Sequence, residues 1–141
     1  KNVRDLVNAG VSAVDVAGSG GTSWSEVEYH RAPNEFHARV AAAFADWGIP
    51  TAEAICYAVN AAPQLPIFAS GGLKDGIDIA KSIALGATLG GLAGAFLKAA
   101  DVSVEAVDQL VRELNAQLRI AMLCSGAETI ADLQRTPLLK D

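Results

Sequence analysis

Two short apolar segments of this chain each run directly into a glycine-rich turn, and a helical pattern follows the first of them. The first segment, residues 66–69, ends in Ser70-Gly71-Gly72, and the second reads Leu89-Gly90-Gly91-Leu92-Ala93-Gly94. Because glycine lacks a Cβ atom, such turns let backbone N–H groups come close to a phosphate. The sequence therefore predicts two consecutive strand-to-helix turns that can hold a phosphate group.

Extended and helical patterns alternate along the chain. Strands are predicted at residues 11–17, 67–69 and 88–93. The predicted helices are one that ends at Ala9-Gly10, one at 35–45, one at 51–62 with Thr51 as N-cap, one at 75–85, one that Ser103 caps and Gly126 ends, and a short one at 128–133. The pattern of residues 25–34 is mixed, with a turn signal at Pro33-Asn34. This alternation favours parallel strands joined by right-handed crossovers.

The fold class that combines these features is the α/β (β/α)8 barrel, also called the TIM barrel. In such barrels the loops after strands seven and eight commonly form a phosphate site, and a complete barrel typically needs ~250 residues. The chain has 141 residues, begins at Lys1 within a helical pattern and has no initiator methionine. We therefore expect an internal piece of a barrel, without a domain boundary of its own.

Composition excludes some classes of function. The net charge is −5, so no electrostatic footprint for a nucleic-acid partner is present. Hydrophobic residues make up 51% of the chain, yet no apolar run approaches ~18 residues, and we expect no membrane span. No signal peptide is visible, which favours a cytoplasmic protein. Cys56 and Cys124 lie within apolar helical patterns and are interpreted as buried free thiols rather than a disulfide or metal ligands.

The loop Gly18-Ser19-Gly20-Gly21-Thr22 allows three interpretations. A dinucleotide-binding fingerprint needs G-x-G-x-x-G, but position 23 is Ser, and no acidic residue follows a second strand at the expected distance. A loop that contacts a phosphate or a flavin ring, with the Thr22 hydroxyl as donor, fits better. The remaining interpretation is a tight turn whose glycines serve only its backbone geometry.

Several polar and aromatic residues have open roles. Asp15 at a strand end is either catalytic or the cap of a neighbouring loop, and Lys74 either adds charge near the phosphate or is solvated. His30 and His37 lack carboxylate spacing suited to a metal and are interpreted as surface residues. The two tryptophans of the chain, Trp24 and Trp47, are predicted in loops on one face of the barrel, where they wall a pocket or anchor the loops.

Five segments carry a resemblance to a known family. They are residues 15–24 with the motif G-G-T-S-W, residues 44–51 with D-W-G-I-P-T, residues 69–73, residues 84–87 and the tail 125–133. In this order the segments resemble type 2 isopentenyl-diphosphate Δ-isomerase over nearly the whole chain.

The resemblance implies a flavoenzyme of isoprenoid biosynthesis that interconverts isopentenyl and dimethylallyl diphosphate with reduced FMN, Mg²⁺ and NADPH as the flavin reductant. Residues 1–141 would be the C-terminal part of a single FMN-binding domain, roughly strands six to eight, and the protein a homo-oligomer. The cofactor-binding residues it implies are Thr22, Gly71, Gly72, Leu73, Lys74, Ala93 and Gly94. The family sometimes has Ser where this chain has Ala17, so that hydroxyl is absent here.

The resemblance also implies what is missing. The family's catalytic Gln, its Mg²⁺-binding Glu and a flavin-contacting Lys belong to earlier strands, so no catalytic or metal-binding residue is expected here, and the isolated chain is expected to be inactive. Two alternatives stay open. One is an FMN-dependent oxidoreductase of the 2-hydroxy-acid oxidase type, which needs a His–Arg pair near the flavin. The other is a non-catalytic half-barrel.

Overall fold

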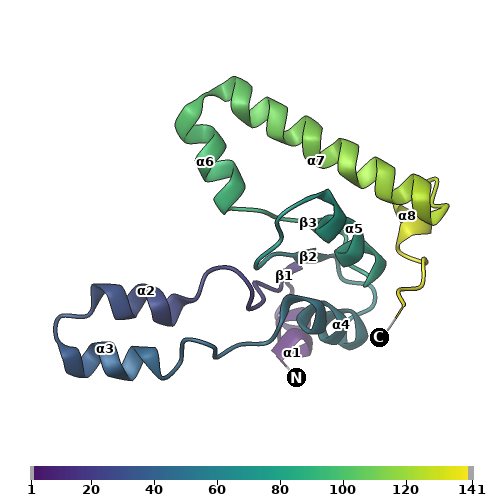
Figure 1. Ribbon diagram of the computed structural model, residues 1–141. Helices are drawn as coiled ribbons and strands as arrows, with labels where there is room; N and C mark the ends of the chain where they lie inside the picture. Colours follow the sequence, from purple (N-terminus) through teal and green to yellow (C-terminus); the bar gives the residue numbers. More distant parts are fainter. Residues whose placement is uncertain (1, 140–141) are drawn as a thin grey trace.

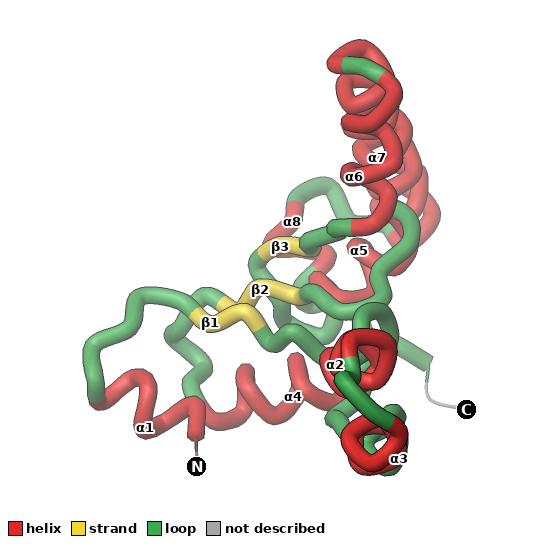
Figure 2. Tube along the Cα trace, turned by 90° about the vertical axis from the view of Figure 1, so that its left-hand side faces the viewer, coloured by secondary structure: helices red, strands yellow, loops and turns green. Residues whose placement is uncertain are grey.

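Three short parallel strands form the centre of the computed structural model, which describes residues 2–139. The strands are β1 (Val14–Asp15), β2 (Ile67–Ala69) and β3 (Leu89–Gly90), and they lie side by side in the order β1-β2-β3 (Figure 2). Phe68 of β2 pairs with Asp15 on one side and with Leu89 on the other. All three strands end at the same edge because they are parallel, so the three loops that follow them begin there.

Eight helices surround or extend from this sheet within residues 2–139. They are α1 (Asn2–Asn8), α2 (Trp24–Arg31), α3 (Glu35–Ala42), α4 (Thr51–Ala61), α5 (Gly76–Ala84), α6 (Gly94–Val102), α7 (Val104–Ser125) and α8 (Ile130–Leu133). Helix α4 packs on β2, α5 on β3, and α7 lies across α5 and α6 (Figure 1). Between residues 2 and 139, no helix is both long enough and apolar enough to cross a membrane.

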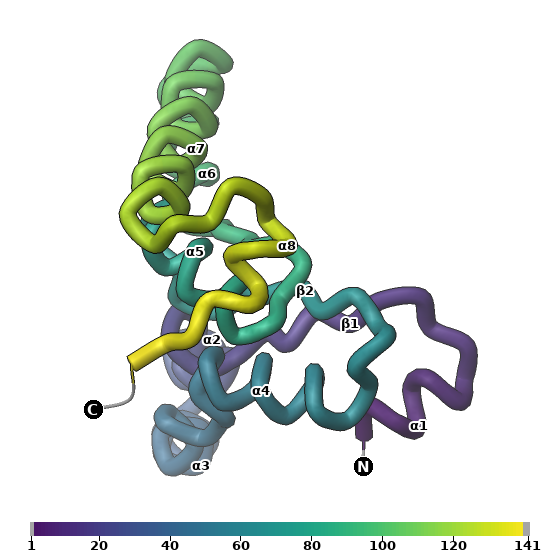
Figure 3. The backbone as a smooth tube through the Cα atoms, turned by 90° about the vertical axis from the view of Figure 1, so that its right-hand side faces the viewer, coloured from purple at the N-terminus to yellow at the C-terminus, as the bar shows by residue number. Residues whose placement is uncertain are grey.

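Two small apolar clusters lie in the core of residues 2–139. Ile55, Ala69 and Ala87 form the first, between α4 and the sheet. The second joins α5 to α7 and α8, which lie together in Figure 3, and its buried members are Ala80, Ile83, Ala127 and Leu133. Burial of these side chains fixes α4 and α5 against the strands, and these two helices position the turns at the strand ends.

Two arms extend away from this core. The α2–α3 hairpin and the α6–α7 pair project from the sheet in different directions (Figure 1). Large apolar side chains on and near these arms are exposed: Trp24 76%, Phe36 65%, Leu97 74%, Val102 76%, Val104 79% and Leu123 80%. A surface of this kind is typical of a segment that packs against more protein.

The predicted strands, turns and most helices are present, with several corrections. Helices α2 and α6 were not expected, and Trp24 begins α2 instead of lying in a loop. Helix α2 buries no residue, so it lacks the apolar stripe that would have predicted it, and the Ser23 side chain caps it. The strands β1 and β3 are shorter than predicted, with two residues each. Cys124 is exposed and Cys56 is half-buried, whereas both were expected to be buried; both are free thiols, as expected.

Candidate functional site

An open cavity lies at the carboxyl edge of the sheet. Its volume is about 800 Å³, within the usual range for small-molecule sites. All seven residues that the resemblance implied line it, namely Thr22, Gly71, Gly72, Leu73, Lys74, Ala93 and Gly94. The two glycine-rich turns and the loop after β1 therefore meet around one space.

The charged side chains that line this cavity are both cationic. Lys74 follows the first turn, and Lys98 lies on α6 one helical turn beyond Gly94. Among residues 2–139, no Asp or Glu lines the cavity, although the chain as a whole carries a net charge of −5. The local field therefore favours an anionic ligand. Sequence reasoning missed Lys98 because α6 was not predicted; its spacing from Gly94 on a helix was the available signal.

The amino terminus of α6 adds free hydrogen-bond donors. Its N-cap residue, Ala93, provides no side-chain cap, and Leu97 is the first residue whose N–H bonds back, to the carbonyl of Ala93. The N–H groups of the first turn are thus available, and the helix dipole adds partial positive charge there. A Cβ atom added at Gly94 would have no neighbour within 4 Å, so the space beside these donors is open. These features fit a phosphate group such as that of FMN.

The loop after β1 packs directly on the turn after β2. Gly71 and Gly72 have φ of +104° and +82°, and Cβ atoms there would collide with the carbonyls of Gly18 and Gly20. Glycine is thus required at both positions by its backbone angles and by the close approach of the two loops. This packing sets the position of Thr22 relative to the first glycine turn.

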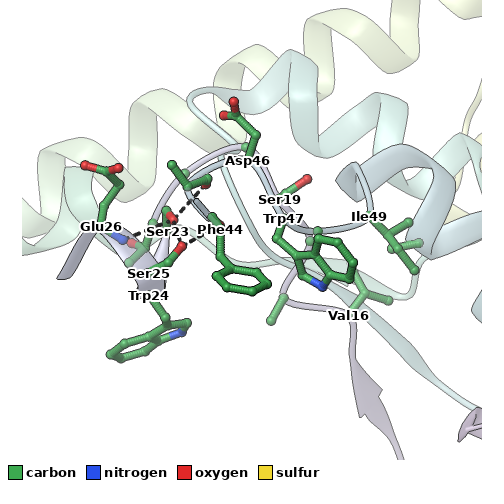
Figure 4. Close-up of a pocket in the computed structure, with 18 residues that line it drawn as sticks. Val16, Ser19, Ser23, Trp24, Ser25, Glu26, Phe44, Asp46, Trp47 and Ile49 are labelled. Carbon is green, nitrogen blue, oxygen red and sulfur yellow. Dashed lines mark hydrogen bonds between the residues drawn. The ribbon is translucent and has the colours of Figure 1, made fainter. Parts of the chain in front are cut away.

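A second cavity, of about 960 Å³, is lined by the same loop (Figure 4). Residues 16–26 and 44–49 line it, and residues 17–18, 20–22 and Trp24 also line the first cavity. The Ser23 hydroxyl donates to the carbonyl of Ala45 at 2.9 Å, and the Ser25 hydroxyl to that of Phe44 at 2.6 Å. Residues 17–24 therefore form a wall between two adjoining spaces.

Trp24 and Trp47, which the sequence analysis singled out, both line this second cavity. Trp47 packs edge-to-face on Phe44 with ring centroids 5.7 Å apart, and its side chain is 81% exposed. Trp24 stands on α2 and is 76% exposed. Both rings thus belong to the wall of a cavity, as one of the two interpretations required, and both present an aromatic face to solvent.

Asp15 connects two strand ends. Its Oδ1 atom accepts from the Ser70 hydroxyl at 2.5 Å and from the N–H of Ala17 at 2.9 Å. Ala17 has φ of +41°, which non-glycine residues rarely adopt, and the bond to Asp15 holds it there. Of the two interpretations of Asp15, these hydrogen bonds favour the loop cap.

Neither histidine lines a cavity. Both are exposed on the α2–α3 hairpin. The Nδ1 atom of His37 lies 2.8 Å from Oδ1 of Asn34, and the Nε2 atom of His30 lies 3.9 Å from Oε2 of Glu26. In the part of the chain that the structure describes, no group of three His, Cys, Asp or Glu residues could hold a metal ion. The histidines therefore offer no His–Arg pair beside the cavity.

Comparison with known proteins places these features in a family. Residues 1–140 match the profile of the FMN-dependent dehydrogenases. The chain is 46% identical over 138 residues to an isopentenyl-diphosphate delta-isomerase of Rickettsia africae (strain ESF-5), and 47% identical over 138 residues to one of Rickettsia bellii (strain RML369-C). Each alignment covers 98% of this chain and 40% of the relative. The chain thus spans about 40% of the length of the curated relatives it matches.

Solved structures show the same architecture. A crystal structure of mandelate oxidase superposes with a TM-score of 0.72 at 24% identity, covering 95% of this chain and 34% of that one. GMP reductase from Trypanosoma brucei, in complex with guanosine 5′-triphosphate, gives a TM-score of 0.67 at 26% identity and covers 95% and 29%. The three parallel strands and their helices are therefore part of a (β/α)8 barrel, as predicted. The chain belongs to the family of FMN-dependent dehydrogenases and, within it, resembles the isopentenyl-diphosphate isomerases.

Proposed function

We propose that this chain is the C-terminal part of a single FMN-binding barrel domain of a type 2 isopentenyl-diphosphate isomerase. The observation that carries the proposal is the cavity where two glycine turns, two lysines and an uncapped helix terminus meet, with no carboxylate of residues 2–139 in its lining. The identity of 46–47% to curated isomerases supports the choice of reaction. The reaction would interconvert isopentenyl and dimethylallyl diphosphate in isoprenoid biosynthesis.

The residues of this chain would bind and orient the cofactor. Gly71, Gly72, Leu73 and Lys74 would surround the FMN phosphate from one side, and Ala93 and Gly94 from the other, with the free N–H groups of α6 as donors. Reduced FMN, when bound, would supply the acid–base chemistry of an allylic proton shift. The Thr22 hydroxyl lies in the wall between the two cavities, where it would donate to the flavin.

The other parts of the reaction would come from outside this chain. The catalytic Gln and the Mg²⁺-binding Glu of the family would belong to the earlier strands, and NADPH would reduce the flavin. The outer edges of β1 and β3 and the apolar residues of the two arms would pack against that part of the barrel. We further propose a cytoplasmic homo-oligomer as the native state.

The test uses the complete natural polypeptide that carries this sequence. With reduced FMN and Mg²⁺ under anaerobic conditions, we expect conversion of isopentenyl to dimethylallyl diphosphate, measured by product chromatography. The same preparation with oxygen and mandelate should not oxidise mandelate to its 2-oxo acid. Oxidation of mandelate without isomerisation would favour the oxidase alternative and contradict the proposal.

The isolated 141-residue chain serves as the matched control. It should show no isomerisation, because the proposed acid–base and metal-binding residues lie outside it. Its exposed apolar arms and unpaired strand edges should also make it self-associate, which analytical ultracentrifugation measures. Turnover by a monomeric preparation would show that the assignment of the catalytic residues to other strands is wrong.

A further inference from the structure

Thr51 does not cap its own helix, contrary to the sequence-based expectation. Pro50 occupies the N-cap position of α4, and no side chain caps that helix terminus. The Thr51 hydroxyl instead donates to the carbonyl oxygen of Gly71 at 2.5 Å and lies 3.5 Å from that of Ser70. This half-buried side chain is thus committed to the glycine turn after β2, although it lines neither cavity.

Hydrogen bonds from Gly18 and Thr51 fix the directions of the Ser70 and Gly71 carbonyl groups. The carbonyl of Ser70 accepts from the N–H of Gly18 at 2.9 Å, and that of Gly71 accepts from Thr51. In an extended strand successive carbonyls alternate in direction, but the φ of +104° at Gly71 turns the second one to the same side as the first. This arrangement needs glycine and two donors to hold it.

The N–H groups of the same two peptides consequently point the other way. Peptide units are planar, and those of residues 2–139 are trans, so the N–H of Gly71 opposes the carbonyl of Ser70, and the N–H of Gly72 opposes that of Gly71. No acceptor among residues 2–139 is hydrogen-bonded to either N–H. Two successive N–H groups on one side form a concavity that binds anions. Both residues line the first cavity.

Close backbone packing leaves little freedom at this junction. A Cβ atom at Gly18 would come within 2.8 Å of the Thr51 nitrogen, and one at Gly71 would collide with the carbonyl of Gly18. The start of α4 is therefore pressed against both loops, and its hydroxyl has a fixed relation to the glycine turn. Without that hydroxyl, the peptide between Gly71 and Gly72 could flip, because glycine at position 72 adopts either sign of φ.

We propose that Thr51 is a positioning residue for the phosphate site: its hydroxyl holds the Gly71 carbonyl so that the N–H groups of Gly71 and Gly72 face the cavity before the phosphate binds. This inference rests on the proposed FMN site and extends it to a residue outside the cavity lining. Thr51 acts only through the turn, and it does not contact the cofactor.

The experiment compares three variants of the complete protein, freed of flavin. Thr51→Val removes the hydroxyl at nearly constant shape, Thr51→Ser keeps it, and Thr136→Val removes a hydroxyl that donates to the Asp132 carbonyl at 3.1 Å, far from the cavity. Fluorescence titrations measure the dissociation constants of FMN and of riboflavin, which lacks the phosphate. We expect Thr51→Val to weaken FMN binding about tenfold and riboflavin binding less than about twofold. Thr51→Ser and Thr136→Val should bind both flavins like the wild type.

Three outcomes would overturn the inference. Equal FMN affinities for Thr51→Val and Thr51→Ser would show that the hydroxyl is not needed. A parallel loss of FMN and riboflavin binding would show a general structural role instead of phosphate positioning. If the wild type itself binds FMN no more tightly than riboflavin, the proposed phosphate site is wrong, and the role of Thr51 falls with it.

A measurement on the wild type covers the case in which Thr51→Val does not fold. With glycine labelled by ¹⁵N, inorganic phosphate is added to the flavin-free protein, and amide resonances are followed by NMR. The resonances of Gly71 and Gly72 should shift with saturation, while that of Gly126, at the far end of α7, should not. The absence of a shift at Gly71 and Gly72 would overturn the inference.

Discussion

The turns after β2 and β3 are alike in sequence, yet the helices that follow them begin in opposite ways. Asp75 caps α5: its Oδ1 atom accepts from the N–H groups of Ile77 at 2.9 Å and Asp78 at 2.8 Å. Helix α6 begins at Gly94, and its N-cap residue, Ala93, provides no side-chain cap. One terminus is therefore satisfied within the chain, whereas among residues 2–139 no side chain caps the other. The repeated sequence pattern therefore gives two similar glycine turns, but the N–H groups at the start of the following helix are capped by a side chain in α5 and uncapped in α6.

The difference extends to packing. Helix α5 buries Gly76, Ala80, Ser82 and Ile83, whereas α6 has no buried residue. The N–H of Gly76 also donates to the Gln117 side chain at 2.7 Å, which ties the start of α5 to α7. The first unit, made of β2, its glycine turn and α5, thus combines a rigid helix start with a turn whose glycine N–H groups have no acceptor among residues 2–139. The second unit, made of β3, its turn and α6, contributes a helix dipole and Lys98.

The largest effect is expected from Gly72→Val, which breaks the first unit. A side chain there meets both a φ of +82° and the carbonyl of Gly20. We expect FMN affinity to fall at least tenfold, or about 1.4 kcal/mol, and stability to fall by roughly 3 kcal/mol. Gly10→Val is the control, because Gly10 has a similar φ of +87° but nothing within 4 Å of a Cβ. Unchanged FMN affinity in Gly72→Val, measured by fluorescence titration, would refute the phosphate assignment.

Ala93→Asp would make the second unit resemble the first. The new carboxylate would lie at the N-cap of α6, where it repels the FMN phosphate, which carries a charge of about −1.5 to −2. FMN affinity should fall about tenfold with little change in riboflavin affinity. Ala93→Asn, which is neutral and of similar shape, is the control and should bind FMN more tightly than the Asp variant. Equal affinities of the Asp and Asn variants would show that no anion binds at this helix terminus.

Lys98→Met tests the charge that belongs only to the second unit. The exposed ammonium group should contribute a screened attraction, so we expect FMN affinity to fall about threefold at low salt. The dependence of the dissociation constant on salt concentration should become shallower. Lys81→Met, on the outer face of α5, is the control and should leave both quantities unchanged. An unaltered salt dependence in Lys98→Met would place this lysine outside the phosphate's reach.

The parts of the fold that were predictable depend on local signals. The three strands end in glycine turns, Ser103 caps α7, and Gly126 ends it with φ of +72°, and each feature follows from neighbouring residues. Helix α2 was missed because its polar and apolar residues are mixed without a clear stripe, and α6 was missed because it follows directly on the apolar segment 88–93, which was predicted as a strand. The partner of Thr51 lies 20 positions away along the chain, and only the folded arrangement brings it to the carbonyl of Gly71. The lining of the cavity was accessible from the motifs, but Lys98 and the support behind the turn were not.

Asp75→Ala should leave the binding unit intact and weaken only the helix. Loss of this cap typically costs about 1 kcal/mol of folding stability, measured by denaturant unfolding. The FMN dissociation constant should change less than about twofold, since the side chain points to its own helix and lines neither cavity. Asp75→Asn should recover most of the stability because Asn also caps helices well. A tenfold loss of FMN affinity in Asp75→Ala would show that the two helix starts do not have separate roles.

The start of helix α8 is stabilised in a third way, by a capping box. Breaking this capping box should have the smallest effect on stability, and the effect should depend on pH. Thr129 and Asp132 form a capping box: the Thr129 N–H and hydroxyl donate to Asp132 Oδ2 at 2.9 and 2.7 Å, and the Asp132 N–H donates to the Thr129 hydroxyl at 3.1 Å. The Thr129 hydroxyl, followed by its backbone N–H, lowers the pKa of the exposed Asp132 carboxyl below its ordinary value. The ionised form is therefore the one that favours the folded state.

The sign of the pH dependence follows from this lowered pKa. Because the folded pKa of Asp132 lies below the unfolded value of about 3.9, the stability from the capping box is fully present above that pH. It is lost as the pH falls through the folded pKa. Thermal unfolding of the wild type and of Asp132→Asn, followed from pH 6 to pH 2, should therefore show a gap in melting temperature that closes at the acid end. A gap between the wild type and Asp132→Asn that stays constant down to pH 2 would mean that the ionised carboxylate does not hold the start of α8.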